Sequence, residues 1–135
     1  MSRVLKFRAW NKEESRLIDL NGFEIAFKGM QKEGEVNAAI EQGNIYMYDT
    51  ADVEIMQFTG LTDKNGVEIY EGDVSPYLEC SRQGKINAQV YYCTETAQFR
   101  VKWIDGGVEN FDSLDDCAKW FEVIGNIHQN PELLK

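Results

Sequence analysis

The stretch from Thr59 to Val74, TGLTDKNGVEIYEGDV, constrains the fold of this chain more than any other feature. It holds three glycines, one of them in the dipeptide Asn65-Gly66, and glycine and asparagine readily adopt the positive φ of tight turns. Four residues, VEIY, resume an extended pattern before the chain turns again at Gly72. Alternating turns and short strands are typical of a tightly bent β structure such as a small barrel. We therefore predict that Thr59–Val74, called the joint below, is architecture.

Alternating apolar and polar residues predict strands on both sides of the joint. VLKFRAW, RLIDL and FEIAF, the last one preceded by Asn21-Gly22, predict a small antiparallel meander in the first 28 residues. NIYMY and VEIMQF have strand-like composition. INAQVYYCTETAQFRVKWIDGGVENF predicts two long strands and a shorter third one that pairs back after the turn at Asp105–Gly107.

Two segments have helical features. The segment from Val36 to Gln42 predicts a loop or a short helix. DSLDDCAKWF predicts a helix, with Ser113 and Asp116 approximating a capping box. Its apolar residues share one helical face: Leu114, Cys117, Ala118 and Phe121. FEVIGNI then predicts a final strand, and Asn130-Pro131 a turn in the tail.

These elements predict a mostly β fold with one or two short helices. We expect an N-terminal β-rich part over residues 1–58, which contains the antiparallel meander. We expect a small SH3-like β-barrel over residues 59–135. The boundary between the two parts then falls at the start of the joint.

Charge and hydropathy narrow the classes of partner. The 135 residues carry 14 Lys and Arg against 23 Asp and Glu, a net charge of −9, which argues against binding duplex nucleic acid over a wide surface. A local basic patch stays open, because net charge does not fix charge distribution. No run approaches the roughly 18 apolar residues of a membrane span, and the N-terminus has no signal-peptide pattern. We expect a cytoplasmic protein with no membrane partner.

The residues that could carry chemistry have simpler structural explanations. Four acids in or beside turns could in principle hold a metal, but turn residues of this kind accept backbone hydrogen bonds; they are Asp63, Glu68, Glu71 and Asp73. The cysteines are widely spaced and the chain has one histidine, which makes a zinc site or a nucleophilic triad hard to assemble; these residues are Cys80, Cys93, Cys117 and His128. We therefore predict no catalytic, cofactor-binding or metal-binding residues, and no cofactor.

A mixed aromatic and basic set raises the possibility of stacking single-stranded nucleic acid on a small barrel. It consists of Tyr91, Tyr92, Phe99, Arg100, Lys102 and Trp103. Strand alternation alone explains it, with Phe99, Val101 and Trp103 in the core and the two basic residues outside. We favour that explanation.

Three long stretches resemble the YopX family, which is found mainly in phages and prophages of bacteria. They are KFRAWNKEESRLI near the N-terminus, MQFTGLTDKNGVEIYEGDV across the joint, and FEVIGNIHQNPELL near the C-terminus. The resemblance spans nearly the whole chain. It implies a mostly β protein with a compact C-terminal barrel and an origin in a phage or mobile element. It implies no reaction and assigns no residue a role.

The first functional hypothesis is a non-enzymatic accessory protein of a phage or prophage that acts by protein binding or self-association. Its partner would be a second copy or a phage or host protein, because β edges and many aromatic residues favour association. Two alternatives stay open at this point. One is a metal-dependent enzyme acting on nucleic acid or nucleotides, and the other is a barrel that binds single-stranded nucleic acid.

Overall fold

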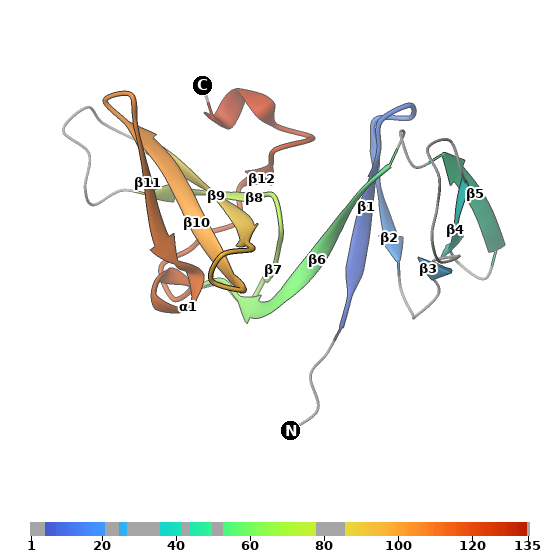
Figure 1. Ribbon diagram of the computed structural model, residues 1–135, viewed down its shortest axis with the longest axis horizontal. Coiled ribbons are helices and arrows are strands. Elements are labelled where there is room, and N and C mark those ends of the chain that lie inside the picture. The colour runs from blue at the N-terminus through green and yellow to red at the C-terminus, as the bar shows by residue number, and fades with distance from the viewer. Residues whose placement is uncertain are drawn as a thin grey trace. The chain divides into compact units, whose positions relative to one another are not determined.

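The computed structural model describes residues 5–20, 25–26, 36–41, 44–49, 53–77 and 86–134. The described chain is mostly β, which confirms the predicted fold class. It divides into two compact units (Figure 1), an N-terminal unit of Met1–Gln57 and a C-terminal unit of Phe58–Lys135. None of the described helices is long and apolar enough to cross a membrane.

The N-terminal unit contains an antiparallel sheet centred on β1. Strand β1 (Phe7–Asn11) pairs with β2 (Arg16–Leu20) on one side and with the first half of β6 (Val53–Thr62) on the other. Ala9 faces Ile18 and Ile55 across the two ladders, so the alternation predicted for this stretch creates a small buried cluster. The strands predicted over RLIDL and VEIMQF are confirmed.

A second, three-stranded sheet corrects two predictions in this unit. It consists of β3 (Ile25–Ala26), β4 (Val36–Glu41) and β5 (Asn44–Asp49). The predicted meander extends only to β1 and β2, because β3, only two residues long, pairs with β4. The loop or short helix predicted over Val36 to Gln42 is also wrong, since all six residues of β4 pair with β5. A helix this short gains too few hydrogen bonds to compete with such a ladder. The predicted turn at Asn21-Gly22 lies outside the described residues.

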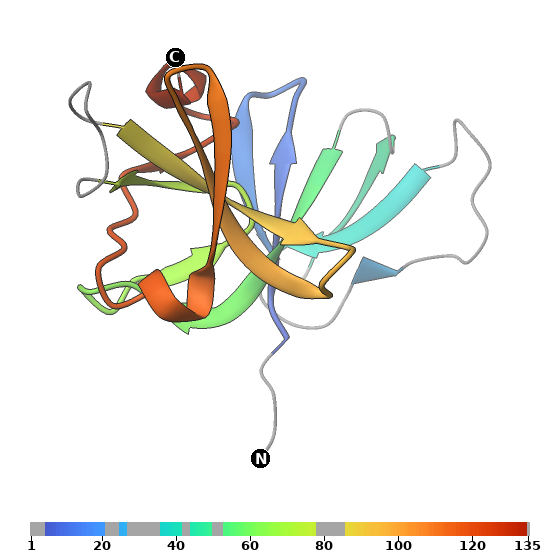
Figure 2. The same ribbon diagram turned by 60° about the vertical axis from the view of Figure 1, so that its left-hand side comes forward.

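The C-terminal unit contains an antiparallel sheet in the order β11-β10-β9-β8-β12. The strands of this sheet are β8 (Asp73–Tyr77), β9 (Ile86–Cys93), β10 (Gln98–Asp105), β11 (Val108–Ser113) and β12 (Gly125–Asn126). The strands cross at steep angles in the turned view (Figure 2), as in a strongly curled half-barrel. Strand β7 (Glu68–Tyr70) pairs with the second half of β6. The three strands predicted over residues 86–113 are therefore confirmed.

The core of this unit lies on the concave face of the curled sheet. Val90 and Val101 are paired across β9 and β10 and are almost fully buried, and each contributes about 1.5–3 kcal/mol by leaving water. A one-turn helix, α1 (Leu114–Cys117), packs against them. The helix predicted over DSLDDCAKWF is therefore a single turn; the four residues of its predicted apolar face are all buried, but Ala118 and Phe121 lie beyond α1. The predicted capping box is wrong, because the side chain of Ser113 makes no capping hydrogen bond.

The C-terminal segment is less regular than the sequence predicts. Only Gly125 and Asn126 of FEVIGNI form a strand, because residues 121–124 hydrogen-bond to separate elements, among them α1, β8 and the joint, rather than forming one continuous ladder. The side-chain oxygen of Asn126 accepts the backbone N–H groups of His128 and Gln129, which bends the chain towards a 3₁₀ helix, η2 (Pro131–Leu134). A Cβ on Gly125 would meet the Asn130 side chain, which would have to move to make room for it.

Candidate functional site

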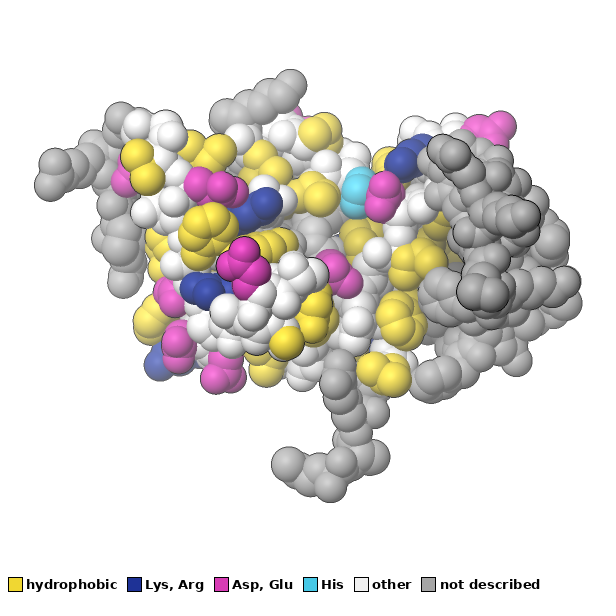
Figure 3. Space-filling view, in the orientation of Figure 1, with side chains coloured by type: hydrophobic (Ala, Val, Ile, Leu, Met, Phe, Trp, Pro, Cys, Tyr) yellow, Lys and Arg dark blue, Asp and Glu magenta, His cyan; other side chains and the backbone are white. Residues whose placement is uncertain are grey.

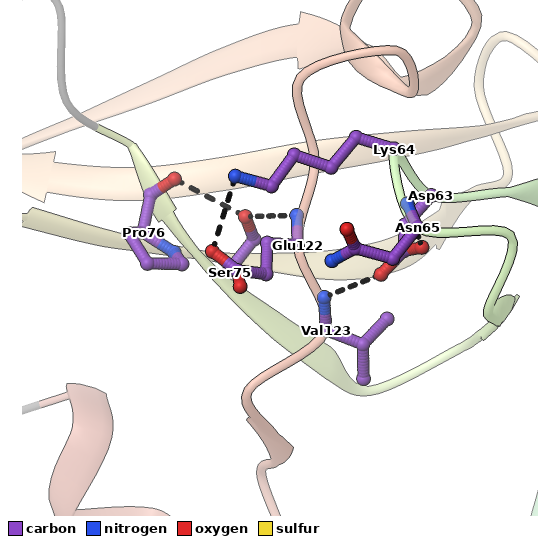
Figure 4. Close-up of polar contacts among 7 residues, drawn as sticks. All are labelled: Asp63, Lys64, Asn65, Ser75, Pro76, Glu122 and Val123. Carbon is purple, nitrogen blue, oxygen red and sulfur yellow. Dashed lines mark hydrogen bonds and ion pairs between the residues drawn. The ribbon is translucent and has the colours of Figure 1, made fainter.

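Asp63 is the organising residue of the joint. Its Oδ1 accepts the backbone N–H groups of Asn65 at 2.8 Å and Val67 at 2.9 Å, which closes the turn around Gly66. Its Oδ2 accepts the N–H of Val123 at 2.9 Å, from the C-terminal segment (Figure 4). One carboxylate therefore shapes the turn and also attaches a segment 60 positions away in sequence.

The same contacts set the charge of Asp63. Burial alone would raise the pKa of this carboxyl, but hydrogen bonds from the backbone N–H groups of Val123, Val67 and Asn65 outweigh it. The pKa is therefore lowered from the ordinary value of 3.8, and the side chain is ionised at neutral pH. An acid held in this way is a structural anion whose oxygens are already engaged.

Further bonds connect the joint, and Ser75 directly after it, with the C-terminal segment. The hydroxyl of Ser75 accepts the N–H of Glu122 at 2.9 Å, and Lys64 pairs with the Glu122 carboxylate at 3.4 Å (Figure 4). Gly72 has φ of +83° and donates its N–H to Val90 while its carbonyl accepts the N–H of Ile127. These contacts give the joint the structural role that its turn residues predict.

The other acids of the joint do not converge with Asp63. Asp73 is buried and its Oδ2 accepts the N–H of Tyr70 at 2.8 Å, while the Tyr70 hydroxyl donates to Glu68 at 3.3 Å. Glu71 is half-buried in the turn before β8. Among the described residues, no three His, Cys, Asp or Glu side chains are grouped so that they could hold a metal ion.

The cysteines and the histidine lie in separate places. Cys117 is buried in the core, where burial first and the charge of Asp112 second raise the pKa of its thiol to about 11. Cys93 lies at the end of β9, where a hydrogen bond from Thr96 lowers its pKa. Half-buried His128 lies in the turn before η2, and Cys80 is outside the described residues.

The aromatic and basic set divides between the two faces of the curled sheet. Phe99 and Trp103 pack against the core beside Val101, as predicted, and Trp103 stacks on Tyr77 with ring centroids 4.2 Å apart. Tyr92 meets Phe99 edge-on at the end of the sheet. Tyr91, Arg100 and Lys102 alternate with these core residues and lie on the convex face.

The convex face also carries an aromatic side chain outside the set named from the sequence. Phe111 is paired with Lys102 across β10 and β11, and its ring lies 5.9 Å from that of Tyr91. The ammonium of Lys102 lies 5.1 Å from the centre of the Tyr91 ring and 3.8 Å from the Glu109 carboxylate. Lys102 is therefore already engaged by the protein itself, which weakens the case for a phosphate-binding surface.

Three large apolar side chains of the β10–β11 hairpin are exposed to solvent: Ile104 at 63%, Val108 at 62% and Phe111 at 48%. They are called the hairpin surface below. Hydrophobic and charged side chains lie close together over this part of the C-terminal unit (Figure 3). The sequence held a signal for it, because Ile104 and Phe111 alternate with core residues and so are apolar residues on a solvent-facing side.

A pocket of about 280 Å³ adjoins the hairpin surface on the convex face. Asn87, Gln89 and Lys102 contribute side chains from the sheet, and Leu133 and Leu134 of η2 form its opposite wall. The Asn87 amide donates to the carbonyl of Leu133 at 2.7 Å and so fixes η2 beside β9. Ile104 and Glu109 lie at the boundary between pocket and hairpin.

Comparison with known proteins identifies the family. The family model of the YopX protein matches residues 6–135. The chain is similar to the crystal structure of protein EF1440 from Enterococcus faecalis, with 27% identity, a TM-score of 0.62, and coverage of 99% of this chain and 100% of the other. Protein yopX from Bacillus subtilis shares the fold at 16% identity, with a TM-score of 0.54 and coverage of 96% and 95%. None of the curated proteins matches the chain. The resemblance noted from the sequence is confirmed: the chain belongs to the YopX family.

Proposed function

We propose that the protein is a non-enzymatic accessory factor of a phage or prophage that acts by binding another protein through its hairpin surface. The observation that carries the proposal is the exposure of three large apolar side chains on one hairpin, between 48% and 63%. Ile104 and Phe111 share the convex face of the hairpin and Val108 lies at its tip, and large exposed apolar groups of this kind are typical of interaction sites. The partner is a phage or host protein, or a second copy of the chain.

The neighbouring contacts favour recognition. Phe111 rests against Tyr91, and Lys102 lies over the Tyr91 ring, so the aromatic groups are ordered before a partner arrives. Ordering side chains at an interface costs about 0.5–1.5 kcal/mol each, and prior order reduces that cost. The carboxylates of Asp63 and Asp73 are bound by backbone N–H groups, which argues against their use in catalysis.

The test compares the unmodified protein with the double variant Ile104→Ser/Phe111→Ser. Each is purified from its natural host cell under native conditions, and co-purifying proteins and native mass are measured. The matched control is Val67→Ser, which removes an apolar side chain of similar exposure, 47%, from the joint. We expect the unmodified protein and the control to keep the same partner or oligomer and the double variant to lose it. An unmodified protein that stays a strict monomer and retains the same proteins as the double variant would contradict the proposal.

A further inference from the structure

Strand β11 is the end strand of its sheet, and no described strand pairs with it on the side away from β10 (Figure 1). A two-residue turn joins the two strands, with φ of +59° at Gly106 and +82° at Gly107. Such a turn makes its flanking residues, Asp105 and Val108, a hydrogen-bonded pair. By alternation, the backbone N–H and C=O groups of Glu109 and Phe111 point to the open side of the sheet.

The charged side chains of β11 itself are all acidic, although Glu109 lies 3.8 Å from Lys102 of β10. The strand contains two acids, Glu109 and Asp112, and no Lys or Arg, and Asp115 and Asp116 follow in α1. Edge strands of globular proteins are often protected by charged side chains, which repel a second edge of the same charge. Pairing this strand with its own copy would place acids near acids, and like charges on adjacent strands are unfavourable. The charge pattern therefore disfavours a second copy and favours a basic strand.

The edge also offers an apolar contact. Phe111 is 48% exposed, and its ring is supported from β9 by Tyr91 at 5.9 Å. Val108, at the hairpin tip, is 62% exposed. A strand laid along β11 would therefore gain backbone hydrogen bonds, apolar contact and charge pairing together, which is the usual basis of recognition by strand addition.

We propose that the open edge of β11 binds an extended segment of another protein that carries Lys or Arg, which adds to the five-stranded sheet as a further strand. Its backbone pairs with Glu109 and Phe111, and its basic side chains meet Glu109 and the acids that follow. This inference rests on the proposed function and specifies the partner's chemistry and mode of binding.

The probe is a fluorescein-labelled peptide in which Val and Lys alternate, titrated with the full-length protein and followed by fluorescence anisotropy. The expected result is saturable binding that weakens as salt is raised. A matched peptide in which Val and Glu alternate should bind at least about tenfold more weakly. Equal binding of the two peptides, or no binding of the Val–Lys peptide, would overturn the inference.

Two substitutions of Phe111 measure separately how much its ring and its backbone N–H contribute to peptide binding. Phe111→Ala removes the ring and keeps the outward N–H, whereas Phe111→Pro removes both and leaves the ladder with β10 intact. Loss of that hydrogen bond should weaken Val–Lys binding by about a further tenfold in the proline variant. Equal affinity of the two variants would place the peptide elsewhere and overturn strand addition.

A charge variant covers the case in which the proline variant fails to fold. Glu109→Lys reverses one charge on an exposed residue, and it should weaken the Val–Lys peptide and strengthen the Val–Glu peptide. Unchanged preference between the peptides would overturn the inference.

The outcomes also separate this inference from the proposed function. Suppose that the Ile104→Ser/Phe111→Ser variant loses its cellular partner but the unmodified protein binds no Val–Lys peptide. Strand addition is then wrong, while the proposed binding of a partner by the hairpin surface is supported. If the peptide binds as expected but the double variant keeps its partners, the edge is confirmed and the proposed function is contradicted.

Discussion

The joint and the β10–β11 hairpin use the same turn chemistry in opposite surroundings. Both reverse the chain with glycines at positive φ, Gly66 and Gly72 in the joint and Gly106 and Gly107 in the hairpin. In the joint, the acid before the turn is buried and bound by three backbone N–H groups. In the hairpin, Ile104 and Val108 beside the turn are exposed, and no described strand pairs with the outer edge of β11.

The difference shows that the sequence of a turn predicts its backbone geometry but not whether the turn serves stability or binding. Asp63 is structural because Val123, 60 positions away, donates to it. Without such a distant segment, the hairpin presents its side chains to solvent. Substitutions in the joint should therefore reduce stability, and substitutions in the hairpin should change binding.

The largest effect is expected for Asp63→Ala. The substitution leaves three backbone N–H groups without their acceptor, and unsatisfied buried donors should cost about 3 kcal/mol in total. The matched variant in the hairpin, Asp105→Ala, should cost less than about 0.5 kcal/mol. Urea unfolding followed by tryptophan fluorescence measures both. Equal losses would break the contrast between the two turns.

The second-largest loss of stability is expected for Gly72→Val. A β-branched residue is strained at φ of +83°, which should cost about 2 kcal/mol of unfolding free energy. Gly72 also bonds through its backbone to Val90 and Ile127, so the strain cannot relax without breaking those contacts. Thermal unfolding measures the loss, and Gly72→Asn serves as the milder control. A melting temperature unchanged by valine would contradict the structural role of this glycine.

Lowering the pH should reduce the unfolding free energy by protonating Asp63. Its pKa is lower in the folded protein than the ordinary 3.8, so the ionised form contributes stability above pH 3.8. That contribution is lost as pH falls through the folded pKa. Unfolding free energies measured at pH 7 and at points below 3.8 should fall more steeply for the unmodified protein than for Asp63→Asn. Parallel pH profiles would show that Asp63 is not held as an anion.

The smallest effect on stability is expected in the hairpin surface. Ile104→Ser and Phe111→Ser should each change the unfolding free energy by no more than about 0.5 kcal/mol, because their side chains are largely exposed. Circular dichroism during urea unfolding provides the measurement. A loss of about 2 kcal/mol or more in either variant would assign that side chain to folding rather than to binding.

The sequence predicted the elements whose signals are local. Alternation along β9 and β10 with a glycine turn before β11 specified three strands, and the i, i+3, i+4, i+7 spacing from Leu114 specified the residues buried in and after α1. Prediction from the sequence failed where the secondary structure depends on pairing with distant segments. Residues Val36–Glu41 became a strand because β5 pairs with them, and β3 paired with β4 rather than continuing a meander.

The candidate site, too, was predictable where its signals are local and not where they depend on distant segments. The acids of the joint were expected to accept backbone hydrogen bonds, but the donor Val123 could not be identified from sequence because only folding brings it to Asp63. The hairpin surface was missed, although Ile104 and Phe111 occupy polar-face positions of an alternating pattern. Apolar residues on that face are the signal to seek in related chains.

Amide hydrogen exchange, measured residue by residue by NMR, tests the contrast between the two regions most directly. The N–H groups of Val67 and Val123 are bound to the buried Asp63 carboxylate and should be strongly protected. Those of Glu109 and Phe111, on the open edge of β11, should exchange at nearly the rate of an unfolded chain. Comparable protection at all four amides, or fast exchange at Val67 and Val123, would contradict the account.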